Sequence, residues 1–196
     1  MRAPTDPYPN VLRDVILARI DGKLDAALSL MESIRFEPAP RKTEKWPARA
    51  VIASVYAQDR YQCRYCGEKV ILTPVMRLLA RLYSEPFPYH TNWKADSTHP
   101  AFVSRSATLD HVIPIAGGGE PLERSNLVTA CWGCNRRKGD LTLDEIGWSL
   151  VEPADPTWLG LTDLYIPLWE AAGRPRLGED ETWWMRAIRT RTSVSG

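Results

Sequence analysis

The sequence predicts an α+β fold in which helices from both ends of the chain surround a small core of two strands and one helix. Three observations support this prediction: the strand-like stretch ATLDHVIPI, a second apolar stretch NLVTA, and a C-x-x-C pair directly after it. The turn Gly117–Gly119 separates the two stretches, because glycine accepts backbone conformations that other residues avoid. A ββα unit of this size buries little core of its own, so a bound metal is expected to stabilise it.

The composition is that of a soluble globular protein. The chain has 196 residues, which suits one domain with an appended arm. Hydrophobic residues make up 44% and charged residues 25%, which disfavours disordered and membrane proteins. A net charge of +1 means that a nucleic-acid partner would have to be held by local basic patches. The first ten residues, MRAPTDPYPN, lack the apolar run of a signal peptide, so we expect a cytoplasmic protein with no membrane partner.

The first third of the chain predicts a helical arm and a linker. Residues 10–36 carry apolar side chains at helical spacing and predict one amphipathic helix, with Asp21–Gly22 as the point where it would break. We expect this helix to pack against the domain; the alternative is an arm for oligomerisation or for binding a partner. Residues 37–47, EPAPRKTEKWP, are rich in proline and charge and predict a linker.

Two helices are predicted on either side of the first C-x-x-C pair. The first covers residues 47–59, and Pro47 suits its first turn. The second covers residues 71–84, with Thr73 as its N-cap and Pro74 in its first turn. The first of these helices leads into the Cys63–Cys66 pair.

Two further segments contain residue types that can bind metals or nucleic acids. Residues 84–106 predict an irregular loop with His90 and His99, which we interpret as surface or packing residues rather than as metal ligands or phosphate contacts. The segment ETWWMRAIRTRTS, residues 181–193, mixes tryptophan with arginine, and we expect its tryptophans to pack in the core rather than to bind nucleic acid.

Helices are also predicted after the core. Thr142 and Glu145 have the spacing of a capping box, which indicates a short helix that ends near Trp148. Residues 162–172 and 179–190 predict two more helices, the first with a proline inside it.

The cysteines form two C-x-x-C pairs, Cys63 with Cys66 and Cys131 with Cys134. In a reducing cytosol, such pairs are expected to be thiolate ligands rather than disulfides or free thiols. Four cysteines match a tetrahedral zinc site with no open coordination position, so this zinc would be structural.

Together these motifs resemble the HNH endonucleases, whose active site lies in a ββα-metal unit. The resemblance rests on DHVIP, the glycine turn, NLV-x-AC-x-x-CN and KG in that order, over residues 62–139 with an insertion at 67–107. It implies a metal-dependent DNA endonuclease that hydrolyses phosphodiester bonds. The resulting domain prediction is an N-terminal helical arm and linker at 1–46, an HNH nuclease domain at 47–148, and a C-terminal helical extension packed on the core at 149–196.

The resemblance implies a role for each reactive residue. His111 would be the general base that takes a proton from the attacking water. Asp110 would bind a catalytic Mg²⁺ or Mn²⁺, and Asn135 would be the second ligand at a position where family members can have histidine. Asn126 corresponds to the middle asparagine, which holds the loop and orients the histidine.

The basic residues that follow are expected to contact DNA. Lys138 would stabilise the phosphate, and together with Arg136 and Arg137 it would hold the backbone without reading bases. The alternative is a non-catalytic zinc-stabilised module that binds nucleic acid or protein; a second is an RNA-directed or nicking-only enzyme. Cutting both strands would usually require a homodimer or a partner subunit.

Overall fold

The computed structural model describes residues 8–35 and 46–192. It forms two compact units, residues 1–44 and 45–196, and each is described by itself. The second unit combines helices with a small antiparallel sheet, which confirms the predicted α+β class. Most of the predicted linker, residues 37–47, lies outside the described residues, and the three-domain division stays a prediction.

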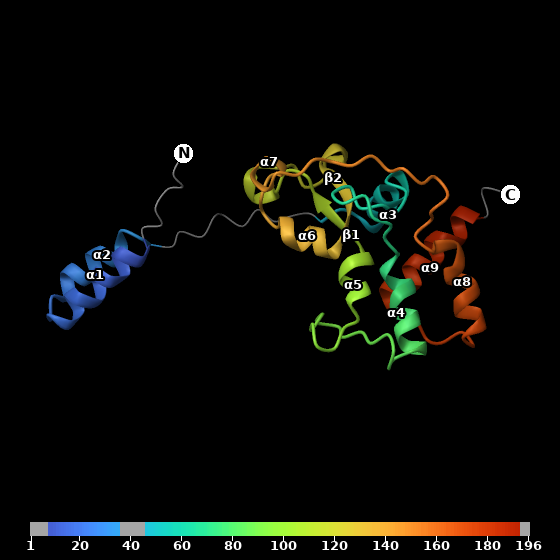
Figure 1. Ribbon diagram of the computed structural model, residues 1–196, viewed down its shortest axis with the longest axis horizontal. Helices are drawn as coiled ribbons and strands as arrows, with labels where there is room; N and C mark the ends of the chain where they lie inside the picture. Colours follow the sequence, from blue (N-terminus) through green and yellow to red (C-terminus); the bar gives the residue numbers. More distant parts are fainter. Residues whose placement is uncertain (1–7, 36–45, 193–196) are drawn as a thin grey trace. The chain divides into compact units, whose positions relative to one another are not determined.

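The first unit is a hairpin of two helices, α1 (Tyr8–Ile20) and α2 (Leu24–Glu32), which run side by side (Figure 1). The helix predicted over residues 10–36 is therefore two helices, and the chain reverses where the break was expected. Gly22 makes this reversal with a φ of +73°, a left-handed conformation that glycine adopts without steric cost.

The second unit holds the strands, two 3₁₀ turns and seven helices within its described residues. In chain order its elements are α3 (Arg49–Gln58), α4 (Thr73–Leu82), α5 (Pro100–Arg105), β1 (Ala107–His111), η1 (Ile115–Gly117), η2 (Arg124–Asn126), β2 (Leu127–Cys131), α6 (Trp132–Lys138), α7 (Leu143–Ile146), α8 (Thr162–Ala171) and α9 (Glu179–Thr192). None of the helices in the described ranges is long and apolar enough to cross a bilayer.

The two strands pair antiparallel, from Ala107 opposite Cys131 to His111 opposite Leu127. Burial alternates along β1, because successive side chains of a strand point to opposite faces. All five residues of β2 are buried. The predicted ββα order of strand, loop, strand and helix is confirmed, since α6 follows directly on β2.

The main core lies where the sheet meets α3, α8 and α9. Tyr165 and Val55 are fully buried, and the indole of Trp184 stacks on the ring of Tyr56 with centroids 5.9 Å apart. Packing of this tryptophan in the core confirms the expectation for the C-terminal helix. Stacked and buried aromatic rings contribute much of the apolar area that stabilises such a core.

The structure corrects two local predictions. Residues 100–105 form α5 within the segment predicted to be irregular, with the ring Nδ1 of His99 accepting the backbone N–H of Ala101 at its first turn. Thr73 is the first residue of α4 rather than its N-cap, and its hydroxyl donates to the carbonyl of Ala107. The capping box of Thr142 and Glu145 is confirmed, although the helix ends at Ile146.

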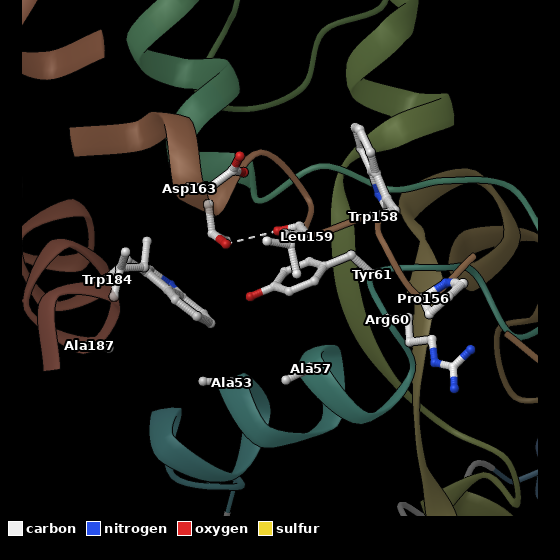
Figure 2. A pocket seen from close by; sticks show the side chains of 12 residues that line it. Ala53, Ala57, Arg60, Tyr61, Pro156, Trp158, Leu159, Asp163, Trp184 and Ala187 are labelled. Carbon is white, nitrogen blue, oxygen red and sulfur yellow. Dashed lines mark hydrogen bonds between the residues drawn. The ribbon is translucent and has the colours of Figure 1, made fainter. Parts of the chain in front are cut away.

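An apolar cavity of about 400 Å³ lies between α3, α9 and the segment before α8 (Figure 2). Figure 2 shows Tyr61 and Leu159 at its centre, with Trp184 on one side and Trp158 on the other. None of the residues assigned to the reactive site lines this cavity, so it takes no part in the site described below.

Candidate functional site

Four cysteines converge at the junction of β2 and α6. Their sulfur atoms all lie within 4.8 Å of one another, which suits a zinc ion at about 2.3 Å from each sulfur. Cys131 Sγ also accepts the backbone N–H of Cys134 at 3.3 Å, a contact that points the sulfur into the cluster. The first pair is shaped by a turn in which Gly67 has a φ of +75° and its N–H donates to the carbonyl of Cys63.

Burial and mutual hydrogen bonds shift the pKa values of these thiols in opposite directions. Hydrogen bonds from Cys131 and then Cys63 lower the pKa of Cys66 to about 2, whereas hydrogen bonds to Cys131 and Cys66, together with burial, raise the pKa of Cys63. Burial raises the pKa of Cys134 to about 12. Four thiolates would repel one another here, so a thiophilic cation has to displace the protons, and zinc affinity should fall as the pH falls.

Asp110 is held by groups from three elements. Its Oδ2 accepts the hydroxyl hydrogen of Tyr65 at 2.7 Å, and its Oδ1 accepts the backbone N–H of His111 at 2.9 Å. Lys138 Nζ lies 3.6 Å from the same Oδ2. Each carboxylate oxygen has a second lone pair, so the carboxylate is fixed in orientation and can still bind a cation.

His111 is at the end of β1 and is only 6% exposed. Its Nε2 lies 3.0 Å from the carbonyl oxygen of Pro121. Because a carbonyl oxygen can only accept, Nε2 carries the ring hydrogen and Nδ1 keeps a free lone pair. The indole of Trp46 meets the imidazole edge to face, with centroids 5.9 Å apart. The ring is thus fixed in the tautomer that a general base needs at Nδ1.

Asn135, in the first turns of α6, approaches β1 from the side of Thr108. Its Nδ2 donates to the carbonyl of Leu109 at 2.9 Å and to the hydroxyl of Thr108 at 3.2 Å. The carbonyl partner requires the amide nitrogen at that position, so Oδ1 is turned away from it. Within the described ranges Oδ1 accepts no hydrogen bond, which leaves it available as an oxygen ligand.

Asn126 closes the loop between the strands. Its Oδ1 accepts the N–H of Ile113 at 2.7 Å, and its Nδ2 donates to the carbonyls of Ile113 and Glu120. Gly119 is required here because a Cβ would lie 2.0 Å from the carbonyl oxygen of Ile113. The loop that carries Pro121 is thereby fixed against the end of β1, and the role of Asn126 in supporting the histidine stays a prediction.

The three basic residues of α6 do not lie together. Lys138 is 1% exposed, and its Nζ donates to the backbone carbonyl of His111 at 2.7 Å. The expectation that Lys138 grips a DNA backbone is therefore corrected, because its ammonium group does not reach the surface. Arg136 and Arg137 are exposed, with their guanidinium groups over the rings of Trp132 and Trp148.

Two contacts at this site were not anticipated from the sequence. Tyr65 lies between two zinc-site cysteines and bonds Asp110, so one short knuckle serves both candidate metal positions. The sequence feature that could have indicated this contact is the position of Tyr65 between two predicted metal ligands. Trp46 covers the His111 ring, and a lone tryptophan at the end of a charged, proline-rich segment was the corresponding signal. By contrast, His90 and His99 accept backbone N–H groups and lie outside the metal-capable cluster.

The fold and the site share the features of one class of protein: a ββα unit with a histidine at a strand end, a carboxylate next to it in the chain, and four clustered cysteines. The comparison with protein families agrees, since residues 98–141 match the family model of the HNH endonuclease. The match covers less than a quarter of the chain, so the likeness to HNH endonucleases holds for residues 98–141. The comparisons with curated proteins and with solved structures gave no match.

Proposed function

We propose that the protein is a metal-dependent DNA endonuclease that hydrolyses phosphodiester bonds. The observation that carries this proposal is the His111 ring: Nε2 is tied to the carbonyl of Pro121, so Nδ1 is presented as the basic nitrogen. The neighbouring carboxylate of Asp110 accepts the backbone N–H of the same residue. A protein that only binds DNA has no need to fix the tautomer of a histidine at a strand end.

The chain's own residues divide the work of the reaction. His111 Nδ1 would accept the proton of the attacking water. Asp110 and Asn135 Oδ1 would hold Mg²⁺ or Mn²⁺, whose remaining positions suit water and a phosphate oxygen. When bound, that cation would supply positive charge at the scissile phosphate and at the leaving oxygen. Asn126 would keep the loop in register so that the imidazole does not rotate.

Lys138 is proposed as a positioning residue rather than a phosphate contact. Its buried ammonium joins the carbonyl of His111 to the carboxylate of Asp110. Burial of a charged amine is costly unless it is paired, and here both partners belong to the reactive dipeptide. Arg136 and Arg137 remain the candidates for the DNA backbone, because they are exposed on α6.

The four cysteines are proposed to hold a structural zinc ion, which suits their sulfur ligands better than Mg²⁺ does. A cytoplasmic location is proposed with it, because a reducing compartment keeps such thiols available. The zinc would join the turn at residues 63–66 to the start of α6.

The test of the nuclease is cleavage of supercoiled plasmid. We expect nicked or linear DNA with Mg²⁺ or Mn²⁺ and intact plasmid with EDTA, measured on agarose gels over time. A matched single-stranded RNA of the same sequence reports whether the activity is restricted to DNA. If the plasmid stays intact with every cation while the protein retains its zinc and binds DNA, the non-catalytic alternative replaces this proposal.

A Tyr65→Phe variant tests the positioning of Asp110. Loss of a hydrogen bond to a charged group costs about 1.5–3 kcal/mol, so we expect cleavage to slow by about 10- to 100-fold. The Mg²⁺ concentration for half-maximal rate should rise, and this change reports on Asp110. Zinc content should not change. Tyr83→Phe, the same change at an exposed tyrosine, is the control. An unchanged Mg²⁺ dependence would refute the role given to Tyr65.

A further inference from the structure

The α1–α2 hairpin leaves a large apolar surface uncovered in its own unit. Among the hydrophobic residues described in this unit, only Ala27 is buried. Seven large aliphatic or thioether side chains are between 43% and 75% exposed. One is Leu17, and the other six are Leu12, Ile16, Ile20, Leu24, Leu28 and Met31. A pair of short helices of this length is not stable alone in water, because it buries too little apolar surface.

These six side chains lie on one face of the hairpin. On α1 they recur every fourth residue, and on α2 they occupy three neighbouring helical positions. The less exposed residues mark the line of contact between the helices: Val11, Val15 and Ala18 on α1, and Ala27 and Leu30 on α2. In each helix the stripe follows this line by one residue, which is about 100° around the helix axis. The two helices run in opposite directions, so rotations of the same sense bring both stripes to the same side. We call this surface the hairpin face.

The charges of the hairpin favour a protein surface over nucleic acid or an anionic membrane as its partner. The described part of the hairpin has four basic and four acidic side chains: Arg13, Arg19, Lys23 and Arg35 against Asp14, Asp21, Asp25 and Glu32. A surface for nucleic acid or for an anionic membrane needs a clear excess of basic residues. A balanced set of charges around an apolar face instead suits another surface of the same kind.

We propose that the hairpin faces of two chains pack against each other, so that the protein is a homodimer joined by a four-helix bundle. A two-fold axis places the same face on both sides of the contact, and each apolar stripe then meets an apolar stripe of the partner. The proposal does not depend on the nuclease activity. If both hold, the dimer supplies two HNH domains in one particle, the usual arrangement for cutting both strands.

Sedimentation equilibrium of the full-length chain tests this proposal. Over about 1–100 µM we expect a mass of twice the 22.2 kDa of one chain. The double variant Ile16→Glu with Leu28→Glu buries two charges in the bundle, so we expect its dimer dissociation constant to rise by at least about 100-fold. Circular dichroism and zinc content show whether the variant remains folded.

Leu17→Glu is the matched control, because Leu17 is 47% exposed but points away from the hairpin face. This variant should remain a dimer. A monomeric mass for the unaltered chain over the whole range would overturn the proposal. The hairpin face would then be covered by another part of the chain or by a different protein. Equal weakening by Leu17→Glu and by the double variant would overturn it as well.

Discussion

Replacing His111 with alanine should slow DNA cleavage by about 10²- to 10⁴-fold, the usual contribution of a positioned general base. DNA binding should survive, because the exposed arginines on α6 are untouched. The ring contributes through Nδ1 and through its hydrogen bond to Pro121, and alanine supplies neither. Single-turnover cleavage and a binding titration in Ca²⁺ separate the two effects.

His90→Ala is the control for this variant, since its ring lies outside the reactive site and accepts only a backbone N–H. We expect its cleavage rate to equal that of the unaltered protein. Robust cleavage by His111→Ala would mean that another group takes the proton from water. Loss of DNA binding in parallel with cleavage would mean that the substitution has disturbed the loop instead.

Cys131→Ser should release zinc and lower the melting temperature by about 10 °C or more. A serine hydroxyl is a poor zinc ligand, and structural zinc sites contribute several kcal/mol to folding. The loss should be large here because Cys131 ends β2 and begins α6. Calorimetry with zinc measured by mass spectrometry gives both values.

A chelator provides the internal control for the cysteine variant. Treatment of the unaltered protein should bring its melting temperature down to that of Cys131→Ser, and the variant should not respond. If Cys131→Ser keeps the zinc stoichiometry and the melting point of the unaltered protein, the cysteines do not form a metal clamp. Because the reactive Asp110 is bonded to the same knuckle through Tyr65, cleavage should fall together with zinc.

Local sequence features predicted the reactive unit well. The strands flanking the glycine turn, the helix after the second C-x-x-C and the capping box of Thr142 all follow from short-range patterns, and the structure has them. The convergence of the cysteines was also predictable, because C-x-x-C is the spacing at which two cysteines can bind the same metal ion.

The elements that the sequence did not reveal depend on their surroundings. α5 has six residues and no helical periodicity, so it is stabilised by the buried Phe102 and by its cap at His99 rather than by its own pattern. Thr73 has the residue type of an N-cap, but its hydroxyl bonds a carbonyl on β1 instead. In both cases a tertiary contact decides between local alternatives that the sequence leaves equal.

Side-chain burial was the hardest property of the site to predict. Lys138 follows two arginines and reads as part of a basic surface, yet α6 turns it inward while its neighbours point out. The partner of Tyr65 is 45 positions further along the chain, and no spacing rule links them. Both contacts belong to the packing of α6 and the first knuckle against β1, which is known only once the fold is known.

The distance along the chain between the two cysteine pairs has a consequence for how this protein can change. A metal ion bound by the four cysteines would fix both ends of the long segment that joins Cys66 to Cys131. For a loop closed in this way, doubling the length costs only about 0.6 kcal/mol of closure entropy. Insertions in the mostly exposed stretch between α4 and α5, residues 83–97, are therefore inexpensive, whereas α4 itself packs Val75 and Leu78 in the core.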